Sequence, residues 1–422
     1  MAISKEIIKA CLRDQRNTIM EAHIVKRDVK FEENGCYVLV GVRHTGKSYL
    51  LYQRIHELLN DGHTWDEIIS IDLDDERLME FTAADFNTLL EIHYEHSSKK
   101  PIIFLDEAQR IGGWELFARR LADQKLTVYI TGSNAKALSY EIASTLGGRY
   151  FIQDVYPYSF SEFLRSQNVV LEKDWEYSTK ERSLVIRLYN EYTQYGGLPE
   201  IVEFAQKRAR LNSLFQKIYL GDICARHKVQ NVYSLNVMIK KLAESVKQPI
   251  SFNRLNSIVS STGYKSSLPT IIDYVDYAIE SWLILPAQNY IAKLVEKESN
   301  KKYYFVDGGL LNLFLLHQET ALLENQVAIH LCRLYGKENL CFANSGGNEI
   351  DFIVEEHKLA IQVAYSLEDE LTKERELNSL AKFQHTHPDW RYIVITNDTE
   401  GDFNYNNTTF HAVPAWKWLL QE

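Results

Sequence analysis

The sequence predicts an α/β protein built on a parallel β-sheet, and three observations support this fold class. Short apolar runs at 36–40, 67–73, 101–105 and 126–131 have the length and content of strands that are buried on both faces. Segments with helical periodicity separate these runs. A glycine-rich loop at 41–48 joins the first run to an apolar helix. Alternating strands and helices of this kind predict a ligand site at the carboxyl edge of the sheet.

The glycine-rich loop, GVRHTGKS, satisfies the phosphate-binding pattern G-x-x-x-x-G-K-[ST] at every fixed position. Its glycines permit backbone angles that let main-chain N–H groups converge on phosphate oxygens at a helix N-terminus. Lys47 is expected to neutralise the β- and γ-phosphates of ATP, and the Ser48 hydroxyl to bind Mg²⁺. A plain glycine turn is the alternative, but the strand before and the helix after favour nucleotide binding. The predicted ATP-binding residues are Gly41, Val42, Arg43, His44, Thr45, Gly46, Lys47 and Ser48.

Composition limits the class of protein. With 422 residues, 45% of them hydrophobic, the chain is long enough for roughly two to four domains with their own cores. Its five cysteines form no C-x-x-C pair, so neither a zinc site nor a disulfide framework is indicated. No run is long and apolar enough to cross a membrane, and a cytoplasmic location is expected. A net charge of −10 argues against binding nucleic acid through bulk charge.

The elements around the loop follow in order. Residues 1–35 are expected to form a helix and a polar connector whose basic side chains, Arg27 among them, face solvent. An amphipathic helix follows the loop over 49–59. The second strand ends in an acidic turn at 74–76, which could approach a nucleotide metal, although a solvated turn is the preferred interpretation.

Two carboxylates, Asp106 and Glu107, end the apolar run 101–105. A buried parallel strand delivers such acids to the ligand crevice, where Asp106 is expected to hold Mg²⁺ through its water shell. Glu107 can then polarise the attacking water. An apolar run that ends in two acids is common, but about 60 residues after a phosphate loop it is a strong signal. The second acid favours a hydrolase over a small-molecule kinase.

Three further residues are candidates for the catalytic site. Ser133 and Asn134 follow the strand at 126–131 and are expected to contact the γ-phosphate or the lytic water, with capping of the next helix as the alternative. Arg149 follows two glycines in the turn before the strand at 150–155. Its guanidinium suits a charge-dispersing finger, in its own chain or in a neighbouring subunit of a homo-oligomer, and a surface arginine is the alternative.

These motifs together resemble a family of bacterial and archaeal AAA+-type ATPases that join an ATPase module to a C-terminal domain of unassigned function. The resemblance is carried by GVRHTGKS, IIFLDEAQRIGGWE, YITGSNAKAL, LGGRYFIQDVYPYSFSEFL and YGGLPEIV, and it continues through DICARHKVQN, YFVDGGLLN, ENQVAIHL, GNEIDFIV and IQVAYSL. It implies a P-loop ATPase core at 1–155, a helical lid at 156–220, a winged-helix-like region at 221–300 and a restriction-endonuclease-like α/β domain at 301–422.

The most basic stretch of the chain lies at 207–228 and contains a single acid, Asp222. It is the candidate face for nucleic acid or an acidic partner, with a solvated helix surface as the alternative. Its basic side chains are Lys207, Arg208, Arg210, Lys217, Arg226, His227 and Lys228. The next segment, 235–305, has the element order of a winged helix. The apparent recognition helix carries Asp273, Asp276 and Glu280 but no Lys or Arg, and is therefore expected to dock a protein rather than DNA.

The C-terminal part resembles the restriction-endonuclease-like core, in which strand and helix acids bind Mg²⁺ and a lysine orients water. Glu324 and Asp351 match the helix acid and the first strand acid. Gln362 and Ala364 stand where the second strand acid and the lysine belong. Because a hard-cation ligand and the ammonium are both missing from this strand, the domain is expected to bind rather than to cut.

The sequence therefore predicts an enzyme that hydrolyses ATP with Mg²⁺ and uses the cycle to move its C-terminal domains against an unidentified protein partner. Two alternatives stay open. One is an ATP-dependent switch or scaffold with slow turnover. The other is a DNA-associated ATPase with a degenerate nuclease domain.

Overall fold

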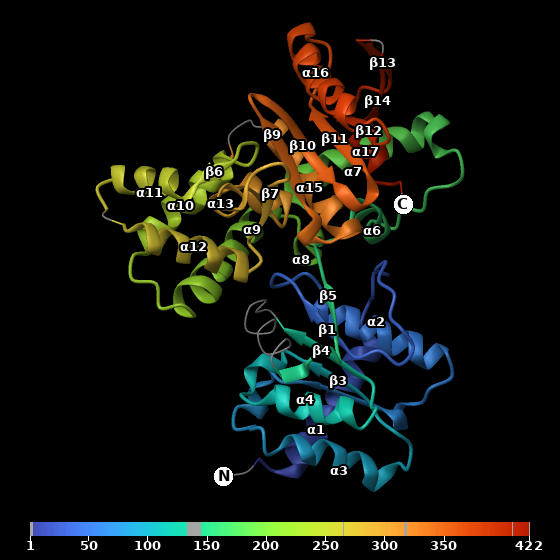
Figure 1. Cartoon of the computed structure of the whole chain (residues 1–422). Helices are drawn as coiled ribbons and strands as arrows, with labels where there is room; N and C mark the ends of the chain where they lie inside the picture. Colours follow the sequence, from blue (N-terminus) through green and yellow to red (C-terminus); the bar gives the residue numbers. More distant parts are fainter. Residues whose placement is uncertain (1–2, 133–144, 265, 316–318, 407, 422) are drawn as a thin grey trace. The chain divides into compact units, whose positions relative to one another are not determined.

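The chain forms two compact units, residues 1–155 and 156–422 (Figure 1). We describe each unit by itself. The computed structural model describes residues 3–132, 145–264, 266–315, 319–406 and 408–421.

The first unit is built on a five-stranded parallel sheet in the order β2-β3-β4-β1-β5. The predicted parallel α/β core is therefore confirmed. Strands β1 and β4 are buried at every residue, which explains why their sequences are nearly continuous apolar runs. The strands are β1 (Tyr37–Val40), β2 (Ile68–Asp72), β3 (Ile102–Asp106), β4 (Val128–Gly132) and β5 (Phe151–Asp154).

Four α-helices accompany this sheet in the described residues: α1 (Lys5–Glu21), α2 (Lys47–Asn60), α3 (Phe86–His96) and α4 (Trp114–Asp123). Helix α2 presents Leu50, Leu51 and Ile55 to the sheet, where they join one apolar cluster with Phe104 and Tyr129. This packing fixes the start of α2, and with it the phosphate loop, against the end of β1.

The second unit contains a nine-stranded mixed sheet in the order β13-β14-β12-β11-β10-β9-β7-β8-β6. Strand β10 pairs antiparallel with β11 as a hairpin, whereas β11 and β12 are parallel. The strands are β6 (Ile250–Ser251), β7 (Ile284–Asn289), β8 (Asn300–Phe305), β9 (Cys341–Ser345), β10 (Asn348–Val354), β11 (Leu359–Ala364), β12 (Arg391–Thr396), β13 (Gly401–Tyr405) and β14 (Thr408–Pro414).

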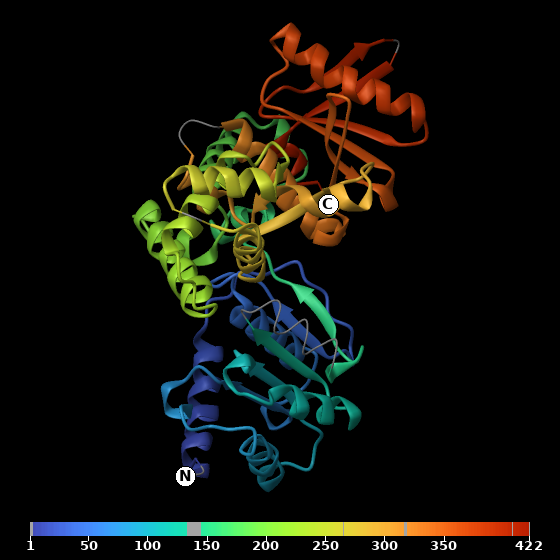
Figure 2. The same ribbon diagram turned by 60° about the vertical axis from the view of Figure 1, so that its left-hand side comes forward.

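Helices lie at both ends of that sheet, and α15 packs against its strands β8, β10 and β11 between them. Helices α10, α11 and α12 gather at the β6 end, and α16 lies with β13 and β14 at the other end (Figures 1 and 2). A π-helical turn, η6 (Lys217–Ala225), leads to the first group. The helices are α6 (Phe160–Ser166), α7 (Thr179–Tyr195), α8 (Pro199–Val202), α9 (Lys207–Gln216), α10 (Val232–Glu244), α11 (Phe252–Ser261), α12 (Leu268–Glu280), α13 (Leu294–Ser299), α14 (Gly308–Asn312), α15 (Glu319–Tyr335), α16 (Glu370–Thr386) and α17 (Ala415–Trp418).

The pairing of β7 with β9 joins two regions that the sequence separates. Strand β7 is antiparallel to β8, as in the wing of a winged helix, and parallel to β9 on its other side. One sheet therefore runs from the winged-helix-like region into the C-terminal region, and the two share a hydrogen-bonded framework.

Candidate functional site

The phosphate loop is folded around its own lysine. The Lys47 ammonium donates to the carbonyl oxygens of Gly41 and Val42, at 3.1 Å each. The Thr45 hydroxyl donates to the Val42 carbonyl at 2.9 Å and closes the turn. Lys47 is buried. Phosphate oxygens that enter this loop would replace carbonyl oxygens as partners of the ammonium.

The loop glycines are required by geometry. A Cβ on Gly41 would lie 2.2 Å from the carbonyl oxygen of Val155, which is closer than any side chain can approach. Gly46 has φ of 87° and stands at the N-cap of α2. His44 adopts a left-handed φ of 64° without being glycine, and such strain is typical of functional loops.

The connector before β1 supports this loop through Arg27, which is buried rather than facing solvent as expected, whereas Lys26 and Lys30 are exposed as expected. Arg27 is buried, and its guanidinium donates to the Thr45 carbonyl at 3.0 Å. The backbone N–H of Arg27 donates to Gln53 on α2 at 2.7 Å, and the Gln53 amide donates back at 3.1 Å. The connector is thus fastened to both the loop and the helix that follows it.

Asp106 lies at the carboxyl end of β3, beside the loop. It is 4% exposed and accepts a hydrogen bond from the Thr131 hydroxyl. Burial raises the pKa of Asp106 to about 6, although its interactions with the Ser48 and Thr131 hydroxyls act in the opposite direction. The Ser48 hydroxyl, from the loop, and the Asp106 carboxylate, from the sheet, are therefore adjacent oxygen donors, as a Mg²⁺ site requires.

Thr131 on β4 holds both predicted acids. Its hydroxyl donates to Asp106, and its oxygen accepts the backbone N–H of Glu107 at 2.9 Å. Glu107 has a left-handed φ of 52°, and its carboxylate accepts a hydrogen bond from the Gln109 amide. Sequence reasoning missed Thr131. The available signal was a polar side chain near the end of an otherwise apolar strand.

Asp72 is a third acid at the same edge. It ends β2 and stands in register with Asp106 on the neighbouring strand. Burial raises the pKa of Asp72, and the charges of Asp74 and Glu107 add to this shift. The turn that follows is paired instead: Asp74 contacts Arg110 at 2.5 Å, which fits the preferred interpretation of a solvated turn.

Of the three remaining predicted catalytic residues, the structure describes one, Arg149. Ser133 and Asn134 lie outside the described residues. Arg149 precedes β5 and so lies at the amino edge of the parallel sheet, whereas the phosphate loop follows β1 at the carboxyl edge. The four residues of β5 separate these edges by about 13 Å. The Arg149 guanidinium contacts Asp123 at 2.7 Å, and its role at a phosphate stays a prediction.

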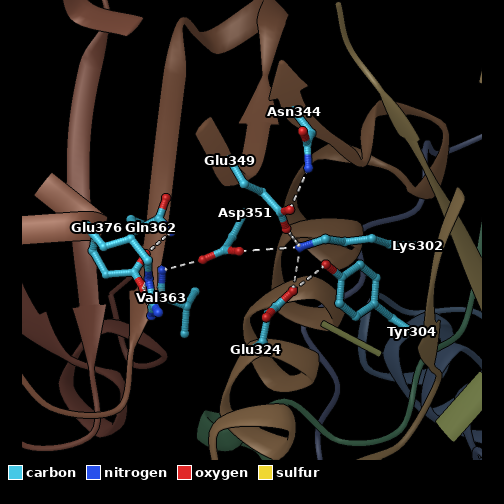
Figure 3. A network of polar contacts seen from close by, with 10 residues as sticks. Lys302, Tyr304, Glu324, Asn344, Glu349, Asp351, Gln362, Val363 and Glu376 are labelled. Atoms are coloured by element: carbon cyan, nitrogen blue, oxygen red, sulfur yellow. Dashed lines mark hydrogen bonds and ion pairs between the residues drawn. The ribbon is translucent and has the colours of Figure 1, made fainter. Parts of the chain in front are cut away.

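The second unit holds a buried ion cluster around Lys302 of β8 (Figure 3). Its ammonium lies 2.9 Å from Glu324, 2.7 Å from Glu349 and 3.3 Å from Asp351. The Tyr304 hydroxyl donates to Glu324 at 2.8 Å. The two acids that match the nuclease pattern thus lie together, with an ammonium between them.

This ammonium corrects one part of the sequence interpretation. Ala364 stands on β11 at the position where the nuclease pattern has its lysine. Lys302 on β8 brings an ammonium to the cluster from a different strand. Burial raises the pKa of Asp351 to about 8, with the charge of Glu324 adding to the shift and Lys302 opposing it. Gln362 donates to Glu376. In the part of the chain that the structure describes, no group of three or more His, Cys, Asp or Glu side chains could hold a metal ion.

Part of the basic segment at 207–228 is neutralised by acids. Lys207 contacts Glu191 at 3.3 Å, and Arg226 contacts Asp222 at 3.4 Å. Arg210 forms an ion pair with Glu200. These pairs favour the solvated-surface alternative over a nucleic-acid face.

None of the helices in the described residues is both long and apolar enough to cross a bilayer.

Fold and phosphate site together define a P-loop protein of the AAA class: residues 33–164 match the AAA domain family. The chain belongs to the family of the uncharacterized protein MJ1544 of Methanocaldococcus jannaschii. It is 30% identical to that protein over 435 residues, which cover 100% of this chain and 96% of the relative. An uncharacterized protein of Haemophilus influenzae is 31% identical over 397 residues, 91% of this chain and 94% of the relative.

The second unit matches a domain of unknown function, DUF8612, at residues 186–321. The nuclease-like character of 301–422 therefore stays a prediction. Among solved structures, the Walker-type ATPase paby2304 of Pyrococcus abyssi is 14% identical with a TM-score of 0.43, covering 74% of this chain and 95% of that one. Cdc6p from Pyrobaculum aerophilum is 13% identical with a TM-score of 0.26, and the match covers 76% of this chain and 93% of that one. Likenesses this distant carry no argument about activity.

Proposed function

We propose that the protein hydrolyses ATP with Mg²⁺ and uses the cycle to change the conformation of its C-terminal region. The observation that supports this best is the buried Asp106 carboxylate at the end of β3, which interacts with the Ser48 hydroxyl of the phosphate loop. This interaction places two oxygen donors side by side, one beside the phosphate loop and one at the end of β3. Oxygen donors of this kind fit Mg²⁺, which Ser48 and Asp106 would hold and which when bound would offset the charge of the phosphates.

The protein's own groups would then act around the phosphates. The Lys47 ammonium would exchange its carbonyl partners for phosphate oxygens, and the N–H groups at the start of α2 would bind the β-phosphate. The Glu107 carboxylate would accept a hydrogen bond from the attacking water. One carboxylate oxygen, Oε2, accepts a hydrogen bond from the Gln109 amide, and the carboxylate can accept a further bond from water.

Steady-state ATP hydrolysis by the wild type and by Glu107→Gln tests the proposal. Loss of a general base lowers turnover by about 100-fold or more. Mg·ATP affinity, measured by calorimetry, should change little, because the phosphate loop is intact. Glu80→Gln, an exposed glutamate outside the site, serves as the matched control. Equal, slow rates in the wild type and Glu107→Gln would overturn hydrolysis as the function.

The second candidate is an ATP-dependent switch or scaffold with slow turnover. Two contacts favour it: Gln109 holds Glu107, and Asp123 holds Arg149 at the other edge of the sheet. Within a single chain, Arg149 therefore supplies no arginine finger to the phosphate loop. Tight Mg·ATP binding without a turnover difference in the experiment above is the result this candidate expects.

A protein is the partner that we propose for the second unit. Helix α12 buries Ile271, Val275 and Ala278, and it exposes Asp273 and Asp276. An acidic exposed face repels phosphate backbones, so it suits a basic protein surface better than DNA.

A further inference from the structure

A cavity of about 400 Å³ lies within the second unit, between the starts of α10 and α12. The residues used below are His227, Lys228, Ser234, Thr270, Asp273 and Tyr277, all of which line it. Ligand pockets in proteins have volumes of about 300–1,000 Å³. The cavity is therefore large enough for a small metabolite, and nothing in the proposed ATPase cycle uses it.

Two helix N-termini meet at this cavity. Helices α10 and α12 each have 13 residues, and each begins with a side-chain cap. Asn231 accepts the N–H of Ser234 at 3.0 Å, and Ser267 accepts that of Thr270 at 3.3 Å. The first N–H groups of a helix have no partner within the helix, and they carry a partial positive charge. Helix α12 has Pro269, which lacks an N–H, in its first turn, so the start of α10 is the end that favours an anionic group.

A buried hydroxyl supplies independent evidence for a ligand. Ser234 is fully buried and lines the cavity, yet its Oγ has no hydrogen-bond partner among the described residues. Buried polar atoms without partners are rare, because each loses its bonds to water. An acceptor that enters the cavity would satisfy this hydroxyl.

The charges around the cavity have both signs. Lys228 is exposed at its rim and adopts a left-handed φ of 50° that directs the chain into the turn before α10. The His227 Nε2 lies 3.6 Å from the Glu280 carboxylate. Asp273 is exposed and opposes an anion on the α12 side. An anion is therefore best placed at the α10 side, near Ser234 and Lys228.

Aromatic rings complete the wall. The His227 ring stacks on the Tyr277 ring with centroids 3.8 Å apart and planes at 11°. Tyr274 is buried, and its hydroxyl donates to the Asn231 carbonyl at 3.4 Å. Flat ring faces next to an anion site suit a ligand that carries both an aromatic ring and an acidic group.

We propose that this cavity is a second ligand site, which binds the phosphate of a small nucleotide-like molecule. The phosphate lies at the start of α10, where it accepts from the Ser234 hydroxyl and pairs with Lys228. The base packs against the His227 and Tyr277 rings. The Asp273 carboxylate can accept from a sugar hydroxyl or a base amino group.

Calorimetric titration of the full chain tests the proposal. Lys47→Ala is used throughout so that the phosphate loop does not contribute. AMP should bind at one site, and inorganic phosphate and adenosine should each bind at least tenfold more weakly. Ser234→Ala and Lys228→Gln should each weaken AMP binding at least fivefold, whereas Lys240→Gln, an exposed lysine on the same helix, should not.

Three results would overturn it: no AMP binding, AMP binding that both cavity variants retain unchanged, or tighter binding of a duplex oligonucleotide that the same variants abolish. Thermal denaturation of Ser234→Ala shows whether this buried position still folds. Lys228→Gln keeps the test decisive, because that side chain is exposed and its loss does not disturb the core.

Discussion

Thr131 shows how much of the phosphate site depends on one hydroxyl. Thr131→Val keeps the shape of the side chain but leaves an Asp106 oxygen and the Glu107 N–H without their partner. We expect a loss of about 1–3 kcal/mol in the free energy of unfolding and at least a tenfold fall in ATP turnover. Denaturant melts and steady-state rates measure both. Thr127→Val, just before the same strand, should match the wild type in turnover.

Asp351 gives a prediction about pH. Its pKa rises from 3.8 to about 8 on folding, because it is buried. Between these values the folded protein holds a proton that the unfolded chain has released. Stability therefore falls as the pH rises across this range, by up to about 1.4 kcal/mol per pH unit, and levels off above it.

Asp351→Asn should remove this dependence, since the amide is neutral at every pH. The melting temperature of the wild type minus that of the variant should be highest near pH 5 and should decrease towards pH 9. Asp398→Asn, at an exposed site of the same unit, should follow the wild-type profile. Parallel profiles for Asp351→Asn and the wild type would contradict the raised pKa.

Single residues of the proposed ATP site could be predicted only where they belong to a motif within a short stretch of sequence. The phosphate loop, Asp106 and Glu107 are recognisable because their spacing and the adjoining strands lie within short stretches of chain. Thr131 and Arg27 act through partners about 20 residues or more away. Their roles depend on which strands become neighbours, and no local pattern reports that.

At the scale of elements, the joint between β1 and α2 is the most constrained. Gly41→Ala would place a methyl group 2.2 Å from the backbone oxygen of Val155, which cannot move without shifting the end of β5. We expect a loss of about 1–3 kcal/mol in stability, as for overpacked sites, and at least a tenfold loss of Mg·ATP affinity. Gly112→Ala has no atom within 4 Å of the new methyl group and should be tolerated. Denaturant melts and calorimetry distinguish the two variants.

Strands and helices could be predicted better than their pairing. Buried strands reveal themselves as apolar runs, and the β10–β11 hairpin is local in sequence. The parallel contact of β7 with β9 joins Gln288 to Cys341, across more than fifty residues. Lys302 enters the acidic cluster through the same arrangement, since β8 is paired with β7. Long-range pairing of this kind leaves no periodic signal in one sequence.

At the scale of the whole molecule, the position of Arg149 predicts an assembly. Because it lies at the amino edge of its own sheet, it can serve as a finger only for a neighbouring copy. Arg149→Ala and Lys47→Ala should each lower turnover by about 100-fold or more. An equal mixture should recover activity, since the first variant keeps the phosphate loop and the second keeps the finger.

Arg119→Ala is the control for this mixing experiment, because Arg119 also contacts Asp123 but lies on α4 rather than in the glycine turn. It should hydrolyse ATP at the wild-type rate. Full activity of Arg149→Ala alone, or no recovery in the mixture, would contradict action across a subunit boundary.

The continuous nine-stranded sheet has a practical consequence for dissecting this protein. A fragment cut at residue 300 would lose β8 and β9 and leave both edges of β7 without partners. Exposed edges of that kind recruit other chains and aggregate. The segment at 221–300, which the sequence predicts to be winged-helix-like, is therefore not a portable module, and binding partners are best sought with the entire second unit as bait.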